Sequence, residues 1–337
     1  MKNGEFFTKP AIGSEGSYIV ENLIPANRLI LGASIPGEGK SLIGMGIVYS
    51  VAYGAPCLGN NVTLGSVMFI DSDNRYDVLK DRGLKIKGGL QLDGYKQKGE
   101  VDFQHYSGFL LDDTSPKMAY RKTWQPIVQA IKDIKPSLIV LDHLRCFHQQ
   151  DEDKSTQMNK VADRLDELMS INGSSLFVLH HFNKNEGTFF KRLRGSSALY
   201  ARSDVAYEFR VLSRRDGKLE KVGLIPQSRK DITAKPIRIG IDEGKDWIKL
   251  VNEGVYQPID DPKTDKLYHD IFHLFLQSGE AMSVNDVRKD VAGFASDKEI
   301  RESFRGLEDK GLLSKKLTRS GKYMYQRSAK KCPWCSP

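Results

Sequence analysis

The amino-acid sequence predicts an α/β fold with a central, mostly parallel sheet and an antiparallel extension at one edge. Apolar segments typical of strands alternate with segments of helical periodicity between residues 29 and 181, as in consecutive βαβ units. The continuous apolar run at residues 138–141 is typical of a strand covered on both faces. From residue 205 onward, shorter apolar segments with Gly217 and Gly244 at turns indicate antiparallel strands.

The composition is that of a globular protein with one large and one small domain. The chain has 337 residues, of which 39% are hydrophobic and 28% charged. No apolar run approaches the ~18 residues of a membrane span, and residues 1–13 lack a signal-peptide core. The four unevenly spaced cysteines do not form a disulfide framework, so we expect a cytoplasmic protein without a membrane partner. A net charge of +8 favours a polyanionic partner, with solubility alone as the alternative.

A glycine-containing loop joins a predicted strand at residues 29–34 to a predicted helix at residues 42–54. Two glycines allow the loop to turn its backbone N–H groups toward an anion, and the helix directs its positive end at the same point. Lys40 is placed to contact the β- and γ-phosphates of ATP, and Ser41 to hold Mg²⁺. Ser34 stands where the usual pattern begins with glycine, and a plain strand–turn–helix corner is the alternative. The expected nucleotide contacts are Ile35, Pro36, Gly37, Glu38, Gly39, Lys40, Ser41 and Leu42.

The chain from residue 66 to residue 170 supplies further elements of the predicted sheet and the helices that cover it. Strands are expected at residues 66–74 and 101–106. A glycine pair at residues 88–89 is expected to break the chain after the first of these helices. The expected helices are residues 76–85, 124–134 and 156–170.

Acidic residues follow two of the predicted parallel strands. Asp142 ends one strand and is expected to position Mg²⁺ together with Ser41; capping of the next segment is the alternative. Asp71 and Asp73 end another strand, and the carboxyl ends of parallel strands share one edge of the sheet. We predict Asp73 as the base that orients the attacking water, because it reaches further outward than Asp71. An exposed polar turn is the alternative, and the short Asp side chain predicts slow basal hydrolysis.

Two histidines, His180 and His181, close the predicted strand at residues 176–179. We expect His181 to donate a hydrogen bond to the γ-phosphate and so to sense its loss. A pair of buried, hydrogen-bonded histidines is one alternative. Zinc binding is another, although the neighbouring sequence offers no matching set of ligands.

The segment at residues 183–195 combines basic side chains with two adjacent aromatic rings. This combination suits single-stranded nucleic acid, because the charges contact phosphates and the rings stack on bases. The alternative is a solvated loop whose phenylalanines pack inward. The candidate contacts are Lys184, Phe189, Phe190, Lys191, Arg192 and Arg194.

A proline- and aspartate-rich joint separates a predicted large domain, residues 1–257, from a small one at residues 265–329. Residues 258–264 are expected to be a linker. Three predicted helices followed by a basic β-hairpin indicate a winged helix, which binds double-stranded DNA or, alternatively, docks a protein. The hairpin residues expected to contact phosphates are Lys315, Lys316, Arg319 and Lys322.

The tail at residues 330–337 carries Cys332 and Cys335. Two cysteines provide only half of a tetrahedral zinc site, so zinc binding here requires ligands from another subunit. A free tail is the default expectation, and a redox pair lacks a thioredoxin-like context.

The order of these motifs resembles that of the RecA-type ATPases, and within them the plasmid RepA-type and DnaB-like replicative helicase branch. The resemblance extends over about residues 15–250 and is strongest in the phosphate loop and in the segment from His180 to residue 199. It implies a hexameric ring with ATP at the subunit interfaces and DNA loops in a central channel. In this family the base is usually Glu, which matches Asp73 here. The family's Lys-x-Arg pair corresponds to residues 227–229, which makes Arg229 the candidate arginine finger and Arg202 the second candidate.

These motifs together predict an ATP-dependent DNA helicase or translocase that uses ATP and Mg²⁺ and grips single-stranded DNA. The first alternative is a DNA-binding ATPase that acts as a switch or loader without translocating. The second is a winged-helix regulator that only binds nucleotide. A small-molecule kinase fits less well, because no substrate lid is evident.

Overall fold

The chain divides into two compact units, residues 1–256 and 257–337. The computed structural model describes residues 18–105, 111, 118–183, 189–193, 198–227, 234–256, 262–291, 297–309, 311–318 and 323–328. Each unit has its own hydrophobic core and is described by itself. Within these described ranges, no helix is both long enough and apolar enough to cross a membrane.

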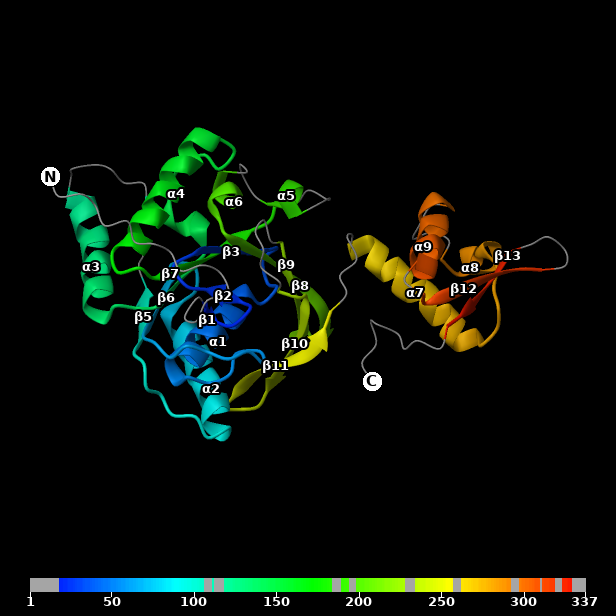
Figure 1. The fold of residues 1–337 in the computed structure, drawn as a ribbon, viewed down its shortest axis with the longest axis horizontal. Helices are drawn as coiled ribbons and strands as arrows, with labels where there is room; N and C mark the ends of the chain where they lie inside the picture. The colour runs from blue at the N-terminus through cyan, green and yellow to red at the C-terminus, as the bar shows by residue number, and fades with distance from the viewer. Residues whose placement is uncertain are drawn as a thin grey trace. The chain divides into compact units, whose positions relative to one another are not determined.

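The larger unit is built on a nine-stranded mixed sheet with the order β11-β10-β9-β8-β3-β7-β6-β4-β5 (Figure 1). Neighbouring strands among β8, β9, β10 and β11 are antiparallel. The strands β8, β3, β7, β6, β4 and β5, in this order across the sheet, are parallel to their neighbours. The predicted α/β class and the antiparallel extension are therefore confirmed. The strands are β3 (Leu29–Ser34), β4 (Val67–Asp71), β5 (Val101–His105), β6 (Leu138–Asp142), β7 (Ser175–His181), β8 (Val205–Arg215), β9 (Lys218–Pro226), β10 (Ile237–Glu243) and β11 (Ile248–Val255).

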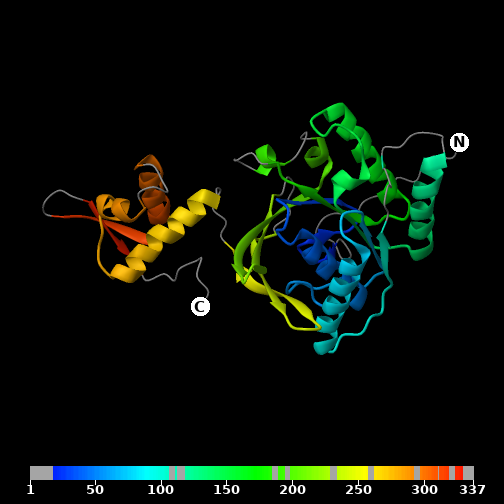
Figure 2. The same cartoon turned by 180° about the vertical axis from the view of Figure 1, so that it is seen from behind.

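Helices cover both faces of this sheet, as the view from behind in Figure 2 also shows. One face packs against α1 (Lys40–Tyr53) and α2 (Tyr76–Leu92), and the other against α3 (Met118–Ile134) and α4 (Ser155–Ser170). Because both faces are buried, β3, β4 and β6 are apolar along their whole length, apart from the polar residues where they end. The remaining elements are β1 (Tyr18–Val20), β2 (Ile24–Pro25), the 3₁₀ helix η1 (Leu144–Phe147), α5 (Phe189–Arg192) and α6 (Ala198–Arg202).

The glycine pair at Gly88 and Gly89 does not break α2, so the prediction of a break is wrong. The helix continues to Leu92 because it packs closely against the turn before β11 and against the start of that strand. A Cβ atom at Gly88 would collide with the carbonyl oxygen of Asp246, and one at Gly89 with that of Ile248. The pair therefore permits a close approach of helix and strand.

The smaller unit consists of three helices and a two-stranded hairpin. Its core includes Ile271, Phe272, Phe304 and Leu307 from two of the helices. The first helix begins at Pro262, inside the stretch expected to be a linker, so that expectation is wrong at its C-terminal end. The elements are α7 (Pro262–Ser278), α8 (Val284–Val291), α9 (Asp297–Asp309), β12 (Leu313–Leu317) and β13 (Tyr323–Arg327).

Gly32, in the middle of the central strand β3, tests how tightly the sheet is packed. A Cβ atom there would lie 2.8 Å from the rings of both Phe177 and Phe209. We expect Gly32→Ala to lower the free energy of unfolding by about 1–3 kcal/mol, because fully buried rings have little room to move. Thermal or denaturant unfolding measures the change.

Gly44 in α1 provides the matched control. A Cβ atom there would meet its nearest neighbour at 3.4 Å, which is ordinary van der Waals contact. Gly44→Ala is expected to leave stability unchanged or to raise it, because Ala favours the helix. Equal losses of stability for the two variants would contradict the assignment of Gly32 to a close contact.

Candidate active site

The predicted phosphate loop lies between the end of β3 and the start of α1. Gly37 has φ +81° and Gly39 has φ +86°, a left-handed conformation that suits glycine. The helix begins at Lys40 directly after the second glycine, so its free N–H groups face the loop. This is the strand–loop–helix arrangement that the sequence predicts for residues 29–54.

Ser34, which stands where the usual loop pattern has glycine, contacts the side chain of Lys40. The ammonium of Lys40 donates hydrogen bonds to the Ser34 hydroxyl oxygen at 2.8 Å and to the Ile35 carbonyl oxygen at 3.0 Å. The Ser34 hydroxyl in turn donates to the Ile35 carbonyl at 2.8 Å. Burial lowers the pKa of Lys40 to about 8, whereas the nearby carboxylates of Asp142 and Glu38 act in the opposite direction. The sequence analysis identified Ser34 only as a departure from the usual glycine and did not predict these hydrogen bonds.

Asp142 ends β6 and is only 2% exposed. Its Oδ2 atom has no hydrogen-bond partner among the described residues, whereas the side chain of Ser41 forms a hydrogen bond to the same carboxyl group. Burial is the main cause that raises the pKa of Asp142 to about 7, and the Ser41 hydrogen bond and the Lys40 charge oppose it. An unpartnered carboxylate oxygen beside a hydroxyl is a hard oxygen donor set, so these residues fit Mg²⁺.

Asp71 and Asp73 have different positions at the end of β4. Asp71 is fully buried, and its side chain accepts hydrogen bonds from the backbone N–H groups of Asp73 at 3.0 Å and Asn74 at 2.8 Å. The Asn74 side-chain amide donates to its other oxygen at 2.7 Å. Asp71 therefore fixes the turn that carries Asp73, whose side chain is 56% exposed. Asp73 lies beyond the strand, because β4 ends at Asp71.

One cavity of about 430 Å³ brings most of the predicted catalytic residues together. Lys40, Ser41, Asp73, Asp142 and His181 all line it, together with the predicted loop residues from Pro36 to Leu42 other than Glu38. The described lining also includes residues that the sequence analysis did not identify, two of which directly follow a predicted acid in the sequence: Asn74 follows Asp73, and His143 follows Asp142. The residues that it did not identify are Asn74, Arg82, His143 and Leu219.

His181 is half-buried at the end of β7, opposite Ser34 in the parallel register. Burial, together with the positive charge of Lys40, lowers the pKa of His181 to about 3, so the ring is neutral at physiological pH. A neutral imidazole has one N–H group to donate. His180 is buried and lies 3.9 Å from Glu152, away from the lining of this cavity. The two neighbouring rings therefore do not form a shared metal site.

The antiparallel extension also contacts the phosphate loop. The guanidinium of Arg214, on β8, donates a hydrogen bond to the Gly37 carbonyl oxygen at 2.7 Å. Leu219, on β9, packs against Gly39 and lines the cavity. The loop is thus held from the β8–β9 hairpin as well as from its own helix, and no pattern in the sequence signalled this contact.

The predicted nucleic-acid segment is only partly described, and two of its residues are not free to bind. Phe189 is 4% exposed and packs against the rings of Phe182 and Tyr200, so the expectation that it stacks on a base is wrong. Arg192 forms an ion pair with Glu208 at 2.8 Å and lies over the ring of Phe182. The side chains of Phe190 and Lys191 lie outside the described residues, as do Lys184 and Arg194.

The candidate arginine fingers and the basic hairpin residues are the remaining predicted site residues. Arg229, Arg319 and Lys322 fall outside the described residues. Arg202 forms ion pairs with Asp163 and Asp166 of α4. On the hairpin, the ammonium of Lys315 lies 4.0 Å from the Tyr323 ring centroid, and Lys316 is exposed.

Comparison with known proteins places these residues in a family. A family profile described as an AAA domain matches residues 11–187, just over half of the chain. The chain belongs to the AAA domain family. The matched region contains the phosphate loop, Asp73, Asp142 and His181, and membership supports a P-loop NTPase that binds nucleotide. Among solved structures, one described as an ATPase domain is similar, with 12% identity and a TM-score of 0.48 over 68% of this chain and 85% of that one.

Asp142, within the matched AAA domain, allows a test of whether its buried carboxylate destabilises the folded protein at high pH. Its pKa in the folded protein, about 7, is above its ordinary value of 3.8, so the stabilisation that its protonation provides is lost as the pH rises from 3.8 to about 7. We expect Asp142→Asn to raise the Tm of the nucleotide-free protein at pH 8, at about 2–4 °C per kcal/mol, and to abolish ATP hydrolysis. The gain in Tm should shrink at pH 5, where Asp142 is protonated.

Asp73→Asn is the control, because its side chain is more than half exposed and its charge is solvated. Its Tm should stay within about 1 °C of the parent at both pH values. A lower Tm for Asp142→Asn at pH 8 would contradict the assignment of a destabilising buried charge.

Asp71 is predicted to position Asp73 without touching the nucleotide. Asp71→Asn still offers one oxygen to the two backbone N–H groups, but its amide then faces the donor amide of Asn74. We expect kcat for ATP hydrolysis to fall roughly 10- to 100-fold, with a smaller change in KM, because a shifted turn would misplace the carboxylate of Asp73, the predicted base.

The double variant Asp71→Asn with Asn74→Asp restores one donor and one acceptor at this contact and keeps the net charge. It should recover much of the lost kcat. If the single variant hydrolyses ATP like the parent, Asp71 does not position Asp73.

Proposed function

We propose that this AAA domain protein is an ATP-dependent DNA helicase or translocase of the RecA type, most similar to the RepA-type and DnaB-like branch. The observation that carries the proposal is the convergence of Lys40, Ser41, Asp73, Asp142 and His181 on one cavity at the carboxyl edge of the sheet. A structural corner between strand and helix has no need for two carboxylates, a buried lysine and a neutral histidine around one space.

Each residue has a separate role in the proposed hydrolysis of ATP. Lys40 and the N–H groups at the start of α1 bind the β- and γ-phosphates, and Lys40 leaves its contacts with Ser34 and Ile35 to do so. Ser41 and Asp142 hold Mg²⁺, which when bound neutralises charge on the phosphate oxygens. Asp73 accepts a hydrogen bond from the attacking water and orients it. His181 donates its N–H to the γ-phosphate.

The proposed partners are single-stranded DNA, double-stranded DNA through the smaller unit, and further copies of the chain. The positive net charge and the exposed Lys316 on β12 support contacts with phosphates. We propose that the smaller unit is a winged helix, because its three helices and hairpin follow in the expected order. A hexamer with Arg229 as a finger in the neighbouring site, in the cytoplasm, completes the proposal.

A non-translocating switch or loader is the second candidate, and the burial of Phe189 favours it. Phe189 lies in the core and Arg192 is paired to Glu208, so neither of these two residues is available to single-stranded DNA. Both candidates predict ATP hydrolysis, and they differ in strand displacement.

Lys40→Ala tests the shared part of the proposal. Loss of the buried ammonium should lower kcat/KM for ATP hydrolysis by on the order of 100-fold or more, because no other described lysine lines the cavity. Steady-state phosphate release with and without single-stranded DNA measures this. Lys80→Ala, an exposed lysine on α2, is the control and should hydrolyse ATP like the parent.

Strand displacement with the parent protein then separates the two candidates. A translocating helicase is stimulated by single-stranded DNA and separates a duplex, whereas a switch or loader is stimulated without separating it. If the parent and Lys40→Ala release phosphate at the same rate, the cavity is not the hydrolysis site and both candidates fail.

A further inference from the structure

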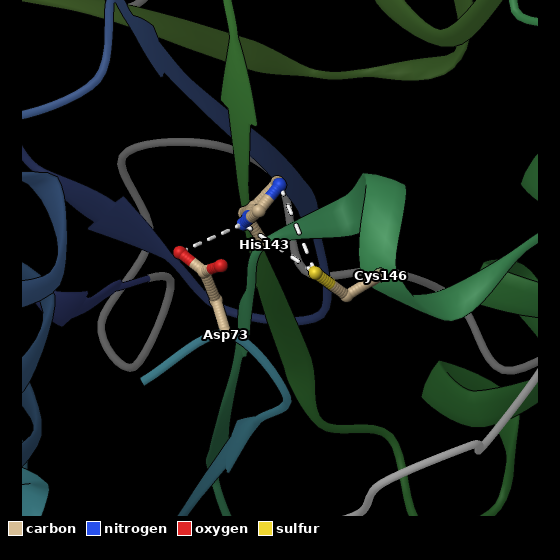
Figure 3. A group of neighbouring side chains, drawn as sticks. All are labelled: Asp73, His143 and Cys146. Atoms are coloured by element: carbon tan, nitrogen blue, oxygen red, sulfur yellow. Dashed lines mark hydrogen bonds and ion pairs between the residues drawn. The ribbon is translucent and has the colours of Figure 1, made fainter. Parts of the chain in front are cut away.

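Three side chains with different ligand chemistry meet at the edge of the cavity: Asp73, His143 and Cys146 (Figure 3). One potential ligand atom from each of them lies within 4.8 Å of the other two. The Asp73 Oδ2 atom is 3.6 Å from Nδ1 of His143, and the Cys146 sulfur is 3.8 Å from the nitrogens of the same ring. None of the roles proposed above uses Cys146.

These distances are close to those between the ligands of a tetrahedral zinc ion. Zn–N and Zn–O bonds of about 2.0–2.2 Å and a Zn–S bond of about 2.3 Å place neighbouring ligand atoms roughly 3.4–3.6 Å apart. The observed 3.6 Å and 3.8 Å exceed these values by only about 0.2 Å. The sulfur is equally far from both ring nitrogens, so the His143 ring or the Cys146 side chain must rotate to place the sulfur and one nitrogen on the same ion.

The backbone holds the three residues in place before any ion arrives. Cys146 and His143 belong to one tight turn at η1, in which the Cys146 N–H donates to the His143 carbonyl at 3.0 Å. The His143 ring packs edge-on against the His181 ring, with centroids 4.1 Å apart. Asp73 stands on the turn that Asp71 fixes. A preformed set of ligands avoids the ordering entropy that a flexible set must lose on binding.

The chemistry of the three ligands selects against Mg²⁺. A thiolate and an imidazole favour Zn²⁺ and similar borderline ions, whereas Mg²⁺ requires hard oxygen ligands such as Ser41 and Asp142. Burial, with the nearby carboxylates of Asp73 and Asp71, raises the pKa of the Cys146 thiol to about 11, so a metal ion has to displace the thiol proton. The exposed side chain of Asp73 leaves the cluster open to solvent.

We propose that Asp73, His143 and Cys146 form a three-ligand site for Zn²⁺, with a fourth position open to water. The thiol proton passes to solvent as the sulfur coordinates the ion. Bound Zn²⁺ occupies the carboxylate of Asp73, so that Asp73 no longer orients the attacking water and ATP hydrolysis stops. Metal binding stands on this geometry alone, whereas the inhibition rests on the proposed function.

Co²⁺ titration of the full-length protein tests the binding. Cys332 and Cys335 are first replaced by Ser in all variants, because the tail cysteines offer competing ligands. We expect a thiolate-to-Co²⁺ charge-transfer absorption that saturates at one equivalent and disappears when Zn²⁺ is added. Cys146→Ser should remove the absorption and weaken Zn²⁺ binding by about 100-fold or more, because loss of a direct ligand exceeds the 10- to 100-fold effect of an outer-shell change. His143→Gln should also weaken it.

The absorption distinguishes Cys146 from the remaining cysteine. Cys57 is buried and stays in every variant as an internal control. Absence of the band in the parent, or its persistence in Cys146→Ser, would overturn the site. Circular dichroism of each variant verifies that it is folded.

Steady-state ATP hydrolysis with saturating Mg²⁺ and increasing free Zn²⁺ tests the inhibition. Cys146→Ser should keep the basal rate and require about 100-fold more Zn²⁺ for half-inhibition than the parent. Equal sensitivity of the two proteins overturns the inhibition. If the parent shows the Co²⁺ band but hydrolyses no ATP, the proposed function fails while the metal site stands.

Discussion

The parallel register of four neighbouring strands is the constraint on which the rest of the site depends. Ser34 lies opposite His181, and Asp71 opposite Asp142, so β3, β7, β6 and β4 end at the same edge of the sheet, with β3 and β7 running slightly further than β6 and β4. A shift of one residue in any of these pairings would turn a polar end group toward a helix-covered apolar face. Because helices bury both faces, the apolar runs fix the register, and the register fixes where the polar ends meet.

Burial then sets the chemistry of these polar ends. Lys40 and Asp142 are both removed from water, which moves the pKa of the lysine down to about 8 and that of the acid up to about 7. Each group already lies near the charge of the other, and the proposed ligands would add phosphate beside the ammonium and a cation beside the carboxylate. Asp71, equally buried, is instead satisfied by the turn it holds. Of these three buried groups, Asp71 is structural, and the proposed ligand-binding roles fall to Lys40 and Asp142.

The sequence predicted the parts of the fold and site that depend on local pattern. The glycine loop, Lys40, Ser41 and the acid after an apolar run are each recognisable within a short stretch of chain, so their types and order suffice. Contacts between distant segments were not predictable in this way. Phe189 packs on Tyr200, Arg214 donates a hydrogen bond to Gly37, and the absence of a side chain at Gly89 allows β11 to lie close to α2. The pair at Gly88 and Gly89 illustrates the limit of local prediction. Local pattern predicts that two glycines end the helix, but here they allow the helix to pack closely against β11 and the turn before it.

Asp73 connects the two proposals of hydrolysis and metal binding. Its carboxylate is short and exposed, and its Oδ2 atom lies 3.6 Å from Nδ1 of the buried His143. A residue in this position is free to orient a water, but it is equally free to join the adjacent imidazole and thiol around an ion. The two proposals therefore compete for one carboxylate, because an ion that binds Asp73 removes the group that the proposed hydrolysis needs for its water.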